Sequence, residues 1–191
     1  MTTQTSARSV IADLEARREY LSENWSLPQE AAKFLYLIAR IGKAKKLLEI
    51  GTSVGYSGLY LGLAAQENGG TLETVDTFED RQKQAIEHFT KAGLDGVICP
   101  ILGDAHEVMA KLAKEERQFD LIFIDADKAG YVDYLQQAEK LLPEGGVLIA
   151  DNTQSHRESM MPFVEAILAS PQWDCADVDT PNGFILARKR G

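Results

Sequence analysis

The chain has 191 residues, 45% of them hydrophobic, a length that suits one well-buried domain better than two. A formal net charge of -9 argues against a broad nucleic-acid surface, because a phosphate-binding face needs clustered Lys and Arg. No apolar run approaches the ~20 residues needed to span a bilayer, so we expect one domain over residues 1–191 that binds neither nucleic acid nor membrane.

Two helical stretches are predicted before the first strand. Residues 6–22 and 28–41 have helical spacing, and Pro28 with Glu30 suits the start of the second stretch. We therefore assign residues 1–42 to N-terminal helices.

From residue 43 onward, strand-like apolar runs alternate with stretches of helical spacing. The strand-like runs are LLEI (47–50), TLETV (71–75), VICPIL (97–102), FDLIFI (119–124) and GVLIA (146–150). Repetition of this unit predicts a Rossmann-like core over residues 43–191, with a parallel sheet covered by helices on both faces.

The last part of the chain breaks this alternation. WDCADVD (173–179) and GFILARK (183–189) are strand-like and are separated only by Thr180, Pro181 and Asn182. That spacing suits a tight hairpin rather than a helical crossover. The predicted fold is therefore α/β, with a doubly wound, mostly parallel seven-stranded sheet and a C-terminal antiparallel hairpin.

Cysteine usage and the N-terminal residues bear on the compartment. Cys99 and Cys175 lie in apolar stretches without metal-type spacing and are predicted to be reduced core residues. The opening sequence MTTQTSARSV lacks the charged-then-apolar pattern of a secretory signal. We expect a cytoplasmic protein.

Doubly wound sheets bind ligands beyond the carboxyl ends of their strands. After the first strand, EIGTSVGYSG supplies Gly51, Gly55 and Gly58, which let the backbone turn tightly and approach a ligand. Ser53 occupies the middle glycine position of the dinucleotide fingerprint, so an NAD-dependent oxidoreductase is disfavoured, and the phosphate loop of ATP and GTP sites is absent. A purely structural turn is the alternative interpretation.

Acidic residues follow the second and third strands. Asp76 can accept two hydrogen bonds from a ribose diol, and a solvated residue or helix cap is the alternative, since Glu79 and Asp80 are close by. Asp104 stands at a predicted helix start, where a cap is the favoured interpretation and a contact to an adenine edge the alternative.

The sequences FIDADK and IADN each run from an apolar strand directly into acidic and amide oxygens. At one end of a parallel sheet, Asp125, Asp151 and Asn152 would form a site for a hard cation, with Lys128 beside it as a possible base. A simple ion pair of Lys128 with Asp125 or Asp127 is the alternative.

Taken in order, E-I-G-T-x-x-G-Y-S, Asp76, G-D-A, F-I-D-A-D-K-x-x-Y and D-N resemble the cation-dependent O-methyltransferases. These are the catechol and caffeoyl-coenzyme A type, on the class I S-adenosylmethionine-dependent fold. The resemblance covers residues 28–152 and continues weakly through the terminal hairpin. It implies an S-adenosylmethionine cofactor, a divalent cation (Mg²⁺ ahead of Mn²⁺ or Ca²⁺), a small hydroxylated aromatic acceptor and a homodimer.

The resemblance also implies which residues bind the cofactor. They are Glu49, Gly51, Thr52, Gly55, Tyr56, Ser57, Asp76, Thr77, Asp104, Ala105 and Asp125. Within this set, Ser57 matches the position that meets the methionine carboxylate, Asp76 the ribose ligand, and Asp104 with Ala105 the segment along the adenine.

Metal and catalytic roles follow in the same way. Asp125, Asp151 and Asn152 match the metal ligands, and Lys128 matches the lysine thought to take the proton from the attacking hydroxyl. Tyr131 completes the motif, but we assign it to packing, because an aromatic at a helix start is more often in the core.

The chain departs from the family pattern around the acceptor. After Asn152 the polar TQSHRES replaces an apolar, glycine-containing loop, and Asn182 stands where an acidic residue is common. His156 in that loop is expected to be solvated. Because walls for a bulky acyl group look missing, a coenzyme A thioester is not the first choice of acceptor.

Two further hypotheses keep the cofactor. In a metal-independent methyltransferase, Asp125 would contact the cofactor's amino group, and Asp151 with Asn152 would cap a strand end. In a non-catalytic S-adenosylmethionine-binding protein, neither a cation site nor the Lys128 base would be needed.

Overall fold

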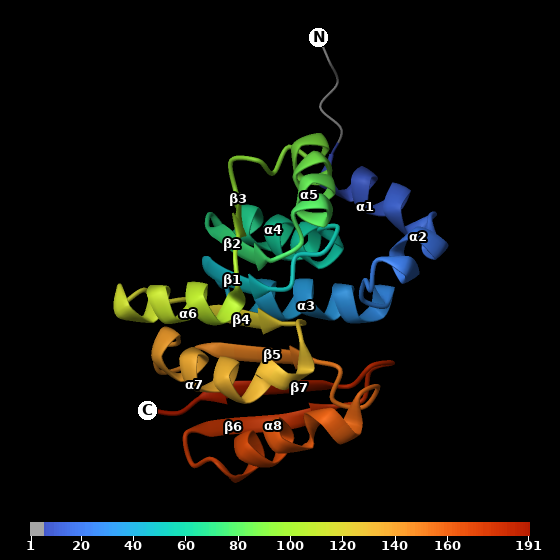
Figure 1. Ribbon diagram of the computed structural model, residues 1–191. Helices are drawn as coiled ribbons and strands as arrows, with labels where there is room; N and C mark the ends of the chain where they lie inside the picture. The colour runs from blue at the N-terminus through green and yellow to red at the C-terminus, as the bar shows by residue number, and fades with distance from the viewer. Residues whose placement is uncertain (1–5) are drawn as a thin grey trace.

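The computed structural model describes residues 6–191, and Figure 1 shows one sheet with helices on both sides. Its strands are β1 (Lys46–Ile50), β2 (Thr71–Asp76), β3 (Ile98–Leu102), β4 (Leu121–Ile124), β5 (Val147–Asp151), β6 (Trp173–Val178) and β7 (Phe184–Lys189). The strand order is β3-β2-β1-β4-β5-β7-β6. β1 to β5 are parallel, and β7 pairs antiparallel with both β5 and β6. The predicted α/β fold with a terminal hairpin is confirmed.

Helices cover both faces of the sheet. They are α1 (Ala7–Glu15), α2 (Arg18–Glu23), α3 (Gln29–Ile41), α4 (Tyr56–Asn68), α5 (Glu79–Lys91), α6 (Ala105–Lys114), the short 3₁₀ helix η1 (Lys128–Gly130), α7 (Tyr131–Leu141) and α8 (Arg157–Ala169). One apolar core lies between the sheet and α1 to α5, and the other between the sheet and α6 to α8. Leu47 and Leu48 of β1 enter opposite cores, because successive side chains of a strand point to opposite faces.

The helix predicted over residues 6–22 is two helices. Arg17, between α1 and α2, has φ -103° and ψ 59°, outside the helical region. At the end of α1, the Glu15 carboxylate accepts hydrogen bonds from the hydroxyls of Tyr56 at 2.9 Å and Tyr60 at 2.6 Å. These contacts join Glu15 to α4, which local spacing could not reveal. The start of α3 at Gln29 agrees with the prediction.

The prediction that both cysteines are core residues is wrong for Cys99 and holds in part for Cys175, which packs against the second apolar core. Cys99 is exposed and Cys175 is half-buried, and both are free thiols. Their strands, β3 and β6, are the two edges of the sheet, so each strand has a neighbour on one side only.

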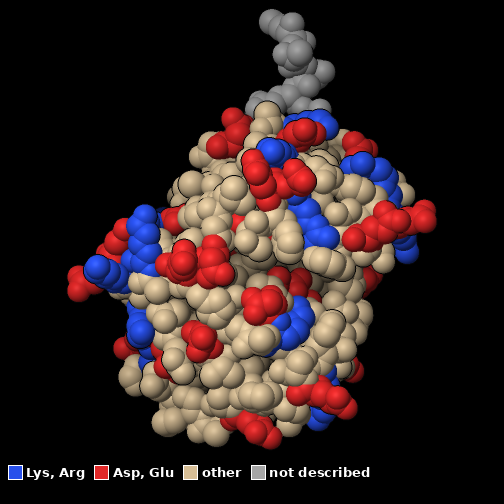
Figure 2. Space-filling model, in the orientation of Figure 1, with Lys and Arg blue, Asp and Glu red and all other residues tan. Residues whose placement is uncertain are grey.

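Two whole-chain properties complete the fold. No helix within residues 6–191 combines the length and the apolar composition needed to cross a membrane. Figure 2 shows acidic and basic side chains intermixed over the face that it displays.

Candidate active site

A cavity of about 770 Å³ lies beyond the carboxyl ends of β1, β2, β4 and β5. The β1 and β4 ends adjoin the point where the strand order reverses, which is where doubly wound sheets bind ligands. Most of the predicted site residues line it, namely Gly51, Thr52, Tyr56, Ser57, Asp76, Thr77, Asp104, Ala105, Asp125, Lys128, Asp151 and Asn152. Glu49 and Gly55 do not line it, so their contribution is to the wall behind it.

The turn after β1 is fixed against both neighbouring strands. Gly51 has φ +102°, and a Cβ there would lie 1.9 Å from the carbonyl oxygen of Asp125. The Gly51 N–H donates to the Val75 carbonyl at 2.9 Å, and the Asp125 N–H donates to the Ile50 carbonyl at 2.8 Å. Glycine is therefore required for the β1 turn to meet the β4 turn, and this contact shapes the cavity floor.

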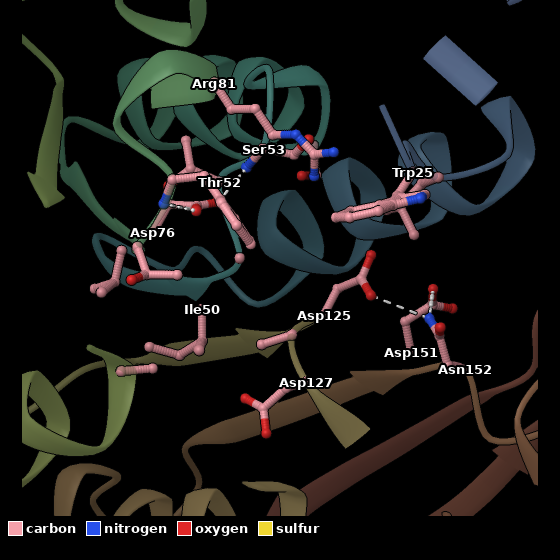
Figure 3. A pocket seen from close by; sticks show the side chains of 18 of the residues that line it. Trp25, Ile50, Thr52, Ser53, Asp76, Arg81, Asp125, Asp127, Asp151 and Asn152 are labelled. Atoms are coloured by element: carbon pink, nitrogen blue, oxygen red, sulfur yellow. Dashed lines mark hydrogen bonds between the residues drawn. The ribbon is translucent and has the colours of Figure 1, made fainter. Parts of the chain in front are cut away.

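Asp76 is held by backbone donors at the end of β2. Its Oδ2 accepts from the Ser53 N–H at 2.7 Å and its Oδ1 from the Phe78 N–H at 2.8 Å (Figure 3). A carboxylate has about four acceptor positions, so each oxygen keeps one for a ligand. Asp76 is not the cap of α5, whose N-cap residue is Phe78 and has no side-chain cap hydrogen bond, so the cap considered as one alternative is absent and the ribose interpretation stays open.

Asp104 caps α6, which confirms the favoured interpretation. Its Oδ1 accepts from the N–H groups of His106 at 2.9 Å and Glu107 at 3.2 Å. Asp104 and Ala105 also line the cavity. On the same side, the His106 ring stacks on Tyr134, with centroids 4.6 Å apart.

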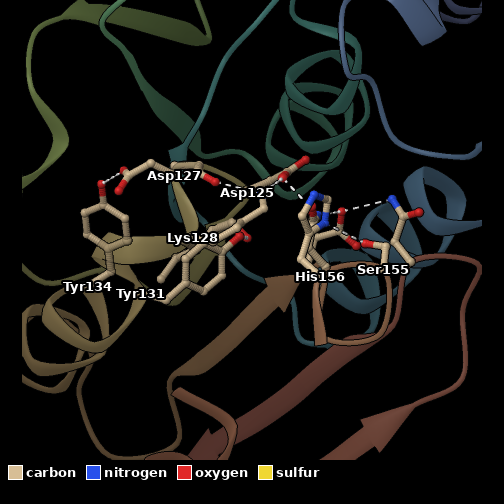
Figure 4. A network of polar contacts seen from close by, with 12 residues as sticks. Asp125, Asp127, Lys128, Tyr131, Tyr134, Ser155 and His156 are labelled. Carbon is tan, nitrogen blue, oxygen red and sulfur yellow. Dashed lines mark hydrogen bonds and ion pairs between the residues drawn. The ribbon is translucent and has the colours of Figure 1, made fainter. Parts of the chain in front are cut away.

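Asp125, Asp151 and Asn152 meet at the carboxyl ends of β4 and β5 (Figure 3), and Figure 4 shows Asp125 beside Lys128. The Asn152 amide donates to Asp125 Oδ1 at 3.1 Å and to Asp151 Oδ2. Asn182, from the β6–β7 turn, donates to Asp151 Oδ2 at 3.2 Å. Asp151 Oδ1 is buried and has no hydrogen-bond partner among the described residues.

Burial makes this carboxylate pair costly to ionise. It raises the pKa of Asp151 to about 7, with repulsion from Asp125 as the next cause. Burial also raises the pKa of Asp125, opposed by the nearby Lys128 ammonium. A bound divalent cation would stabilise the ionised forms of both groups.

The residues at this position fit a hard divalent cation. Carboxylate and amide oxygens are the ligand types of Mg²⁺, Mn²⁺ and Ca²⁺, and the unpaired Asp151 Oδ1 is available to one. No metal-type group of three or more His, Cys, Asp or Glu occurs in the described part of the chain. A cation bound here would need the Asn152 amide oxygen as its third protein ligand.

Lys128 lies at the edge of the same cluster. Its Nζ is 3.4 Å from Asp125 Oδ1 and donates to the Ala126 carbonyl at 2.7 Å, so the ion pair considered from the sequence is present. The side chain keeps 20% of its surface exposed and lines the cavity. Tyr131 is fully buried, which agrees with its assignment to packing.

The structure adds cavity residues that sequence reasoning missed. Trp25, Phe78, Arg81 and Tyr134 all line the cavity, although none belongs to a recognised motif. The exposed His156 lines it too, and its Nδ1 lies 3.0 Å from the Ser155 hydroxyl. Only the path of the chain brings these side chains to the site.

Comparison with known proteins gives a consistent result. The O-methyltransferase family model matches residues 4–162. A flavonoid 3',5'-methyltransferase of Vitis vinifera is 34% identical, covering 86% of this chain and 80% of that protein. A catechol O-methyltransferase of Niastella koreensis is 36% identical, over 66% of this chain and 58% of that protein. The crystal structure of the O-methyltransferase from Bacillus cereus in complex with SAH has a TM-score of 0.85 and 27% identity, covering 95% of this chain and 91% of that one.

Proposed function

Because this chain belongs to the O-methyltransferase family, an S-adenosylmethionine-dependent group of enzymes, we propose that it methylates a small catechol-like or phenolic acceptor. The methyl group is transferred to a hydroxyl of that acceptor with the help of a divalent cation. The observation that carries this proposal is the meeting of Asp125, Asp151 and Asn152 beside Lys128 in one cavity.

The two ends of the cavity suit two different ligands. Asp76 ends β2, Asp104 follows β3 and Ser57 lies in the first turn of α4, and these residues offer polar contacts to the ribose, adenine and methionine parts of the cofactor. The carboxylate and amide oxygens lie at the ends of β4 and β5. An acceptor over that second cluster would be next to the methyl group it receives.

The chemistry needs alignment and removal of one proton. A sulfonium methyl group is already activated, so the acceptor oxygen must be placed in line with it and made nucleophilic. A bound divalent cation would lower the pKa of the acceptor hydroxyl and fix its direction. We infer that Lys128, whose Nζ contacts the Ala126 carbonyl, takes the hydroxyl proton as a neutral amine.

The dimensions and lining favour a small acceptor. Ligand pockets typically measure ~300–1,000 Å³, so about 770 Å³ suits the cofactor together with one small aromatic molecule. Ser155, His156 and Asn182 give that end a polar rim in place of the apolar loop expected of the family. A long acyl chain would have no apolar wall on this side.

One observation favours metal-independent transfer as a second candidate. Lys128 pairs with Asp125, and the amides of Asn152 and Asn182 donate to the two carboxylates, so much of the cluster is satisfied by protein groups. The unpaired Asp151 Oδ1 is the feature that this candidate leaves unexplained.

The test is methyl transfer from labelled S-adenosylmethionine to a panel of small catechols and hydroxycinnamates, with Mg²⁺ and with a chelator. Transfer that disappears with chelator and returns with added Mg²⁺ supports the cation site. Transfer that survives chelation favours the metal-independent candidate. No transfer in either condition would count against this acceptor class and favour a non-catalytic, cofactor-binding role.

A further inference from the structure

Side chains from two distant parts of the sequence meet in the lining of the cavity, namely Trp25 and the neighbouring Phe78 and Arg81. The Arg81 guanidinium of α5 lies over the Trp25 indole, 3.7 Å from the ring centroid. Phe78 meets the same indole edge-on, with centroids 6.4 Å apart. Figure 3 shows Arg81 reaching from α5 toward the Trp25 ring.

The fold gains little from a tryptophan at position 25. Trp25 follows α2 with φ 53°, and the N–H of Ser26 donates to the Leu21 carbonyl at 3.0 Å, a helix ending that favours Gly or Asn. The indole is 67% exposed, so the strained backbone is not offset by burial of the ring. Strained residues of this kind gather at ligand sites, and Trp25 lines one.

Arg81 is the cation of the cavity lining that has no carboxylate partner. No ion pair or side-chain hydrogen bond of its guanidinium occurs among residues 6–191, whereas Lys128 pairs with Asp125. The other ionisable side chains of the lining are mostly carboxyl groups, namely those of Asp76, Asp104, Asp125, Asp127 and Asp151. Arg81 is therefore the lining residue best suited to attract an anionic ligand.

Stacking uses the face of the guanidinium and leaves its edge free. The N–H groups of arginine lie in the guanidinium plane and match the two oxygens of a carboxylate. A guanidinium held flat on an aromatic ring also loses less conformational freedom when it binds. Trp25 thus orients Arg81 for a planar anion at the cavity mouth.

We propose that Arg81, oriented by Trp25, is a carboxylate-binding subsite of this cavity. The carboxylate belongs either to the acceptor, which would then be a hydroxylated aromatic acid, or to the methionine part of the cofactor. The acceptor source rests on the proposed function, and the cofactor source does not.

The experiment measures dissociation constants by calorimetry for two matched pairs of ligands. One pair is 3,4-dihydroxycinnamate and its neutral methyl ester, bound to SAH-loaded protein with Mg²⁺. The other is SAH and 5'-methylthioadenosine, which lacks the amino-acid part. Arg81→Gln should weaken the binding of the carboxylate-bearing ligand in one pair about tenfold, which corresponds to the loss of one charged hydrogen-bonded contact. The dissociation constant of the ligand without the carboxylate should stay within twofold of the wild-type value.

Two further variants separate ligand binding from folding. Lys83→Gln removes one positive charge from the same helix, outside the cavity, and should leave all four constants unchanged. Trp25→Gly should weaken the same ligand as Arg81→Gln but raise the melting temperature, because glycine tolerates the positive φ. A merely structural role for Trp25 would lower the melting temperature instead.

The outcomes assign the source or reject the subsite. If Arg81→Gln weakens only the binding of 3,4-dihydroxycinnamate and not that of its ester, Arg81 binds the carboxylate of the acceptor. If it weakens only the binding of SAH and not that of 5'-methylthioadenosine, Arg81 binds the carboxylate of the cofactor. Equal effects of Arg81→Gln within both pairs, or no effect, overturn the proposal. If neither cinnamate binds, the proposed acceptor class fails, while the SAH pair still tests Arg81.

Discussion

At the residue scale, the site is governed by the buried Asp151 and the half-buried Asp125, two carboxylates that share one amide donor. Asp125 and Asp151 both accept from Asn152, and burial raises the pKa of each. Such a pair is unfavourable when ionised unless a cation or a proton compensates it. The same carboxylates that are costly in the free protein would therefore bind a divalent ion well.

Replacement of Asp151 by Asn tests this cost directly. Asp151→Asn should abolish Mg²⁺-stimulated transfer while leaving the dissociation constant for SAH within about threefold, since the residue lies at the β5 end. Calorimetry and the transfer assay measure the two effects. Asp177→Asn on the exposed side of β6 is the control. Loss of SAH binding together with activity would show that Asp151 is structural.

Removal of the Lys128 amine tests the proposed base. Lys128→Met should lower kcat by about 10²- to 10⁴-fold, the usual range for a general base, with little change in the KM for the acceptor. Lys114→Met, on the exposed side of α6, should leave both constants unchanged. Wild-type kcat in the Lys128 variant would remove this residue from the mechanism.

Glu49 predicts a pH dependence of stability. Burial, opposed by the hydroxyls of Ser57 and Thr74, raises the pKa of its carboxyl from 4.5 to about 7. Between about pH 4.5 and pH 7, the Glu49 carboxyl is therefore protonated in the folded chain and ionised in the unfolded chain. The resulting stabilisation is present at low pH and is lost as pH rises from about 4.5 to about 7.

Substitution by glutamine should remove that dependence. Urea unfolding measures the free energy of unfolding of the wild type and of Glu49→Gln across this pH range. The free energy should fall with rising pH in both proteins, but by roughly 3 kcal/mol less in Glu49→Gln, at ~1.4 kcal/mol per pKa unit. Glu165→Gln, on the exposed side of α8, should follow the wild-type curve. Parallel curves for wild type and Glu49→Gln would contradict the assignment.

At the element scale, the site exists because the turns after β1 and β4 touch. Gly51→Ala would place a methyl group 1.9 Å from the Asp125 carbonyl oxygen at φ +102°. We expect a loss of at least about 2 kcal/mol in the free energy of unfolding and weaker SAH binding, because the two turns must separate.

A second glycine isolates the clash from the backbone strain. Gly69, at the end of α4, has φ +70°, and a Cβ at this position would meet nothing within 4 Å. Gly69→Ala should cost only about 1 kcal/mol and leave SAH binding unchanged. Denaturant unfolding and calorimetry on both variants make the comparison, and similar losses in the two would argue against the close approach at Gly51.

At the scale of the whole molecule, we propose that residues 6–191 form one cooperative domain; residues 1–5 of the expected domain lie outside the described part of the chain. α1 and α3 pack into the same apolar core as α4 and β1, so the N-terminal helices should unfold with the sheet. Scanning calorimetry should give a single transition whose calorimetric and van't Hoff enthalpies agree. A separate early transition would show that the segment before residue 43 unfolds by itself.

The homodimer implied by the family resemblance also stays a prediction. Leu37 and Ile41, one turn apart on α3, are 52% and 75% exposed and could contribute to such an interface. Sedimentation of the wild type against Ile41→Glu measures whether this stripe contributes to assembly.

The sequence alone determined the sheet, the hairpin and the residues at the strand ends. Alternating apolar runs specify parallel strands, and the three residues between 173–179 and 183–189 allow only a tight turn. Since parallel strands end at one edge of a sheet, Asp125 and Asp151 could be brought together without coordinates. These inferences need only local periodicity and one topological rule.

The tertiary structure alone decided which side chains surround those residues. The contacts of Glu15 with α4, beside the break between α1 and α2, link distant elements, and the exposure of Cys99 depends on β3 being an edge strand. Trp25 and Arg81 are 56 positions apart by their numbers and carry no motif, yet they stack over one cavity. Periodicity reports which face of an element is buried, whereas such pairings depend on how distant elements pack, and only the folded chain specifies that.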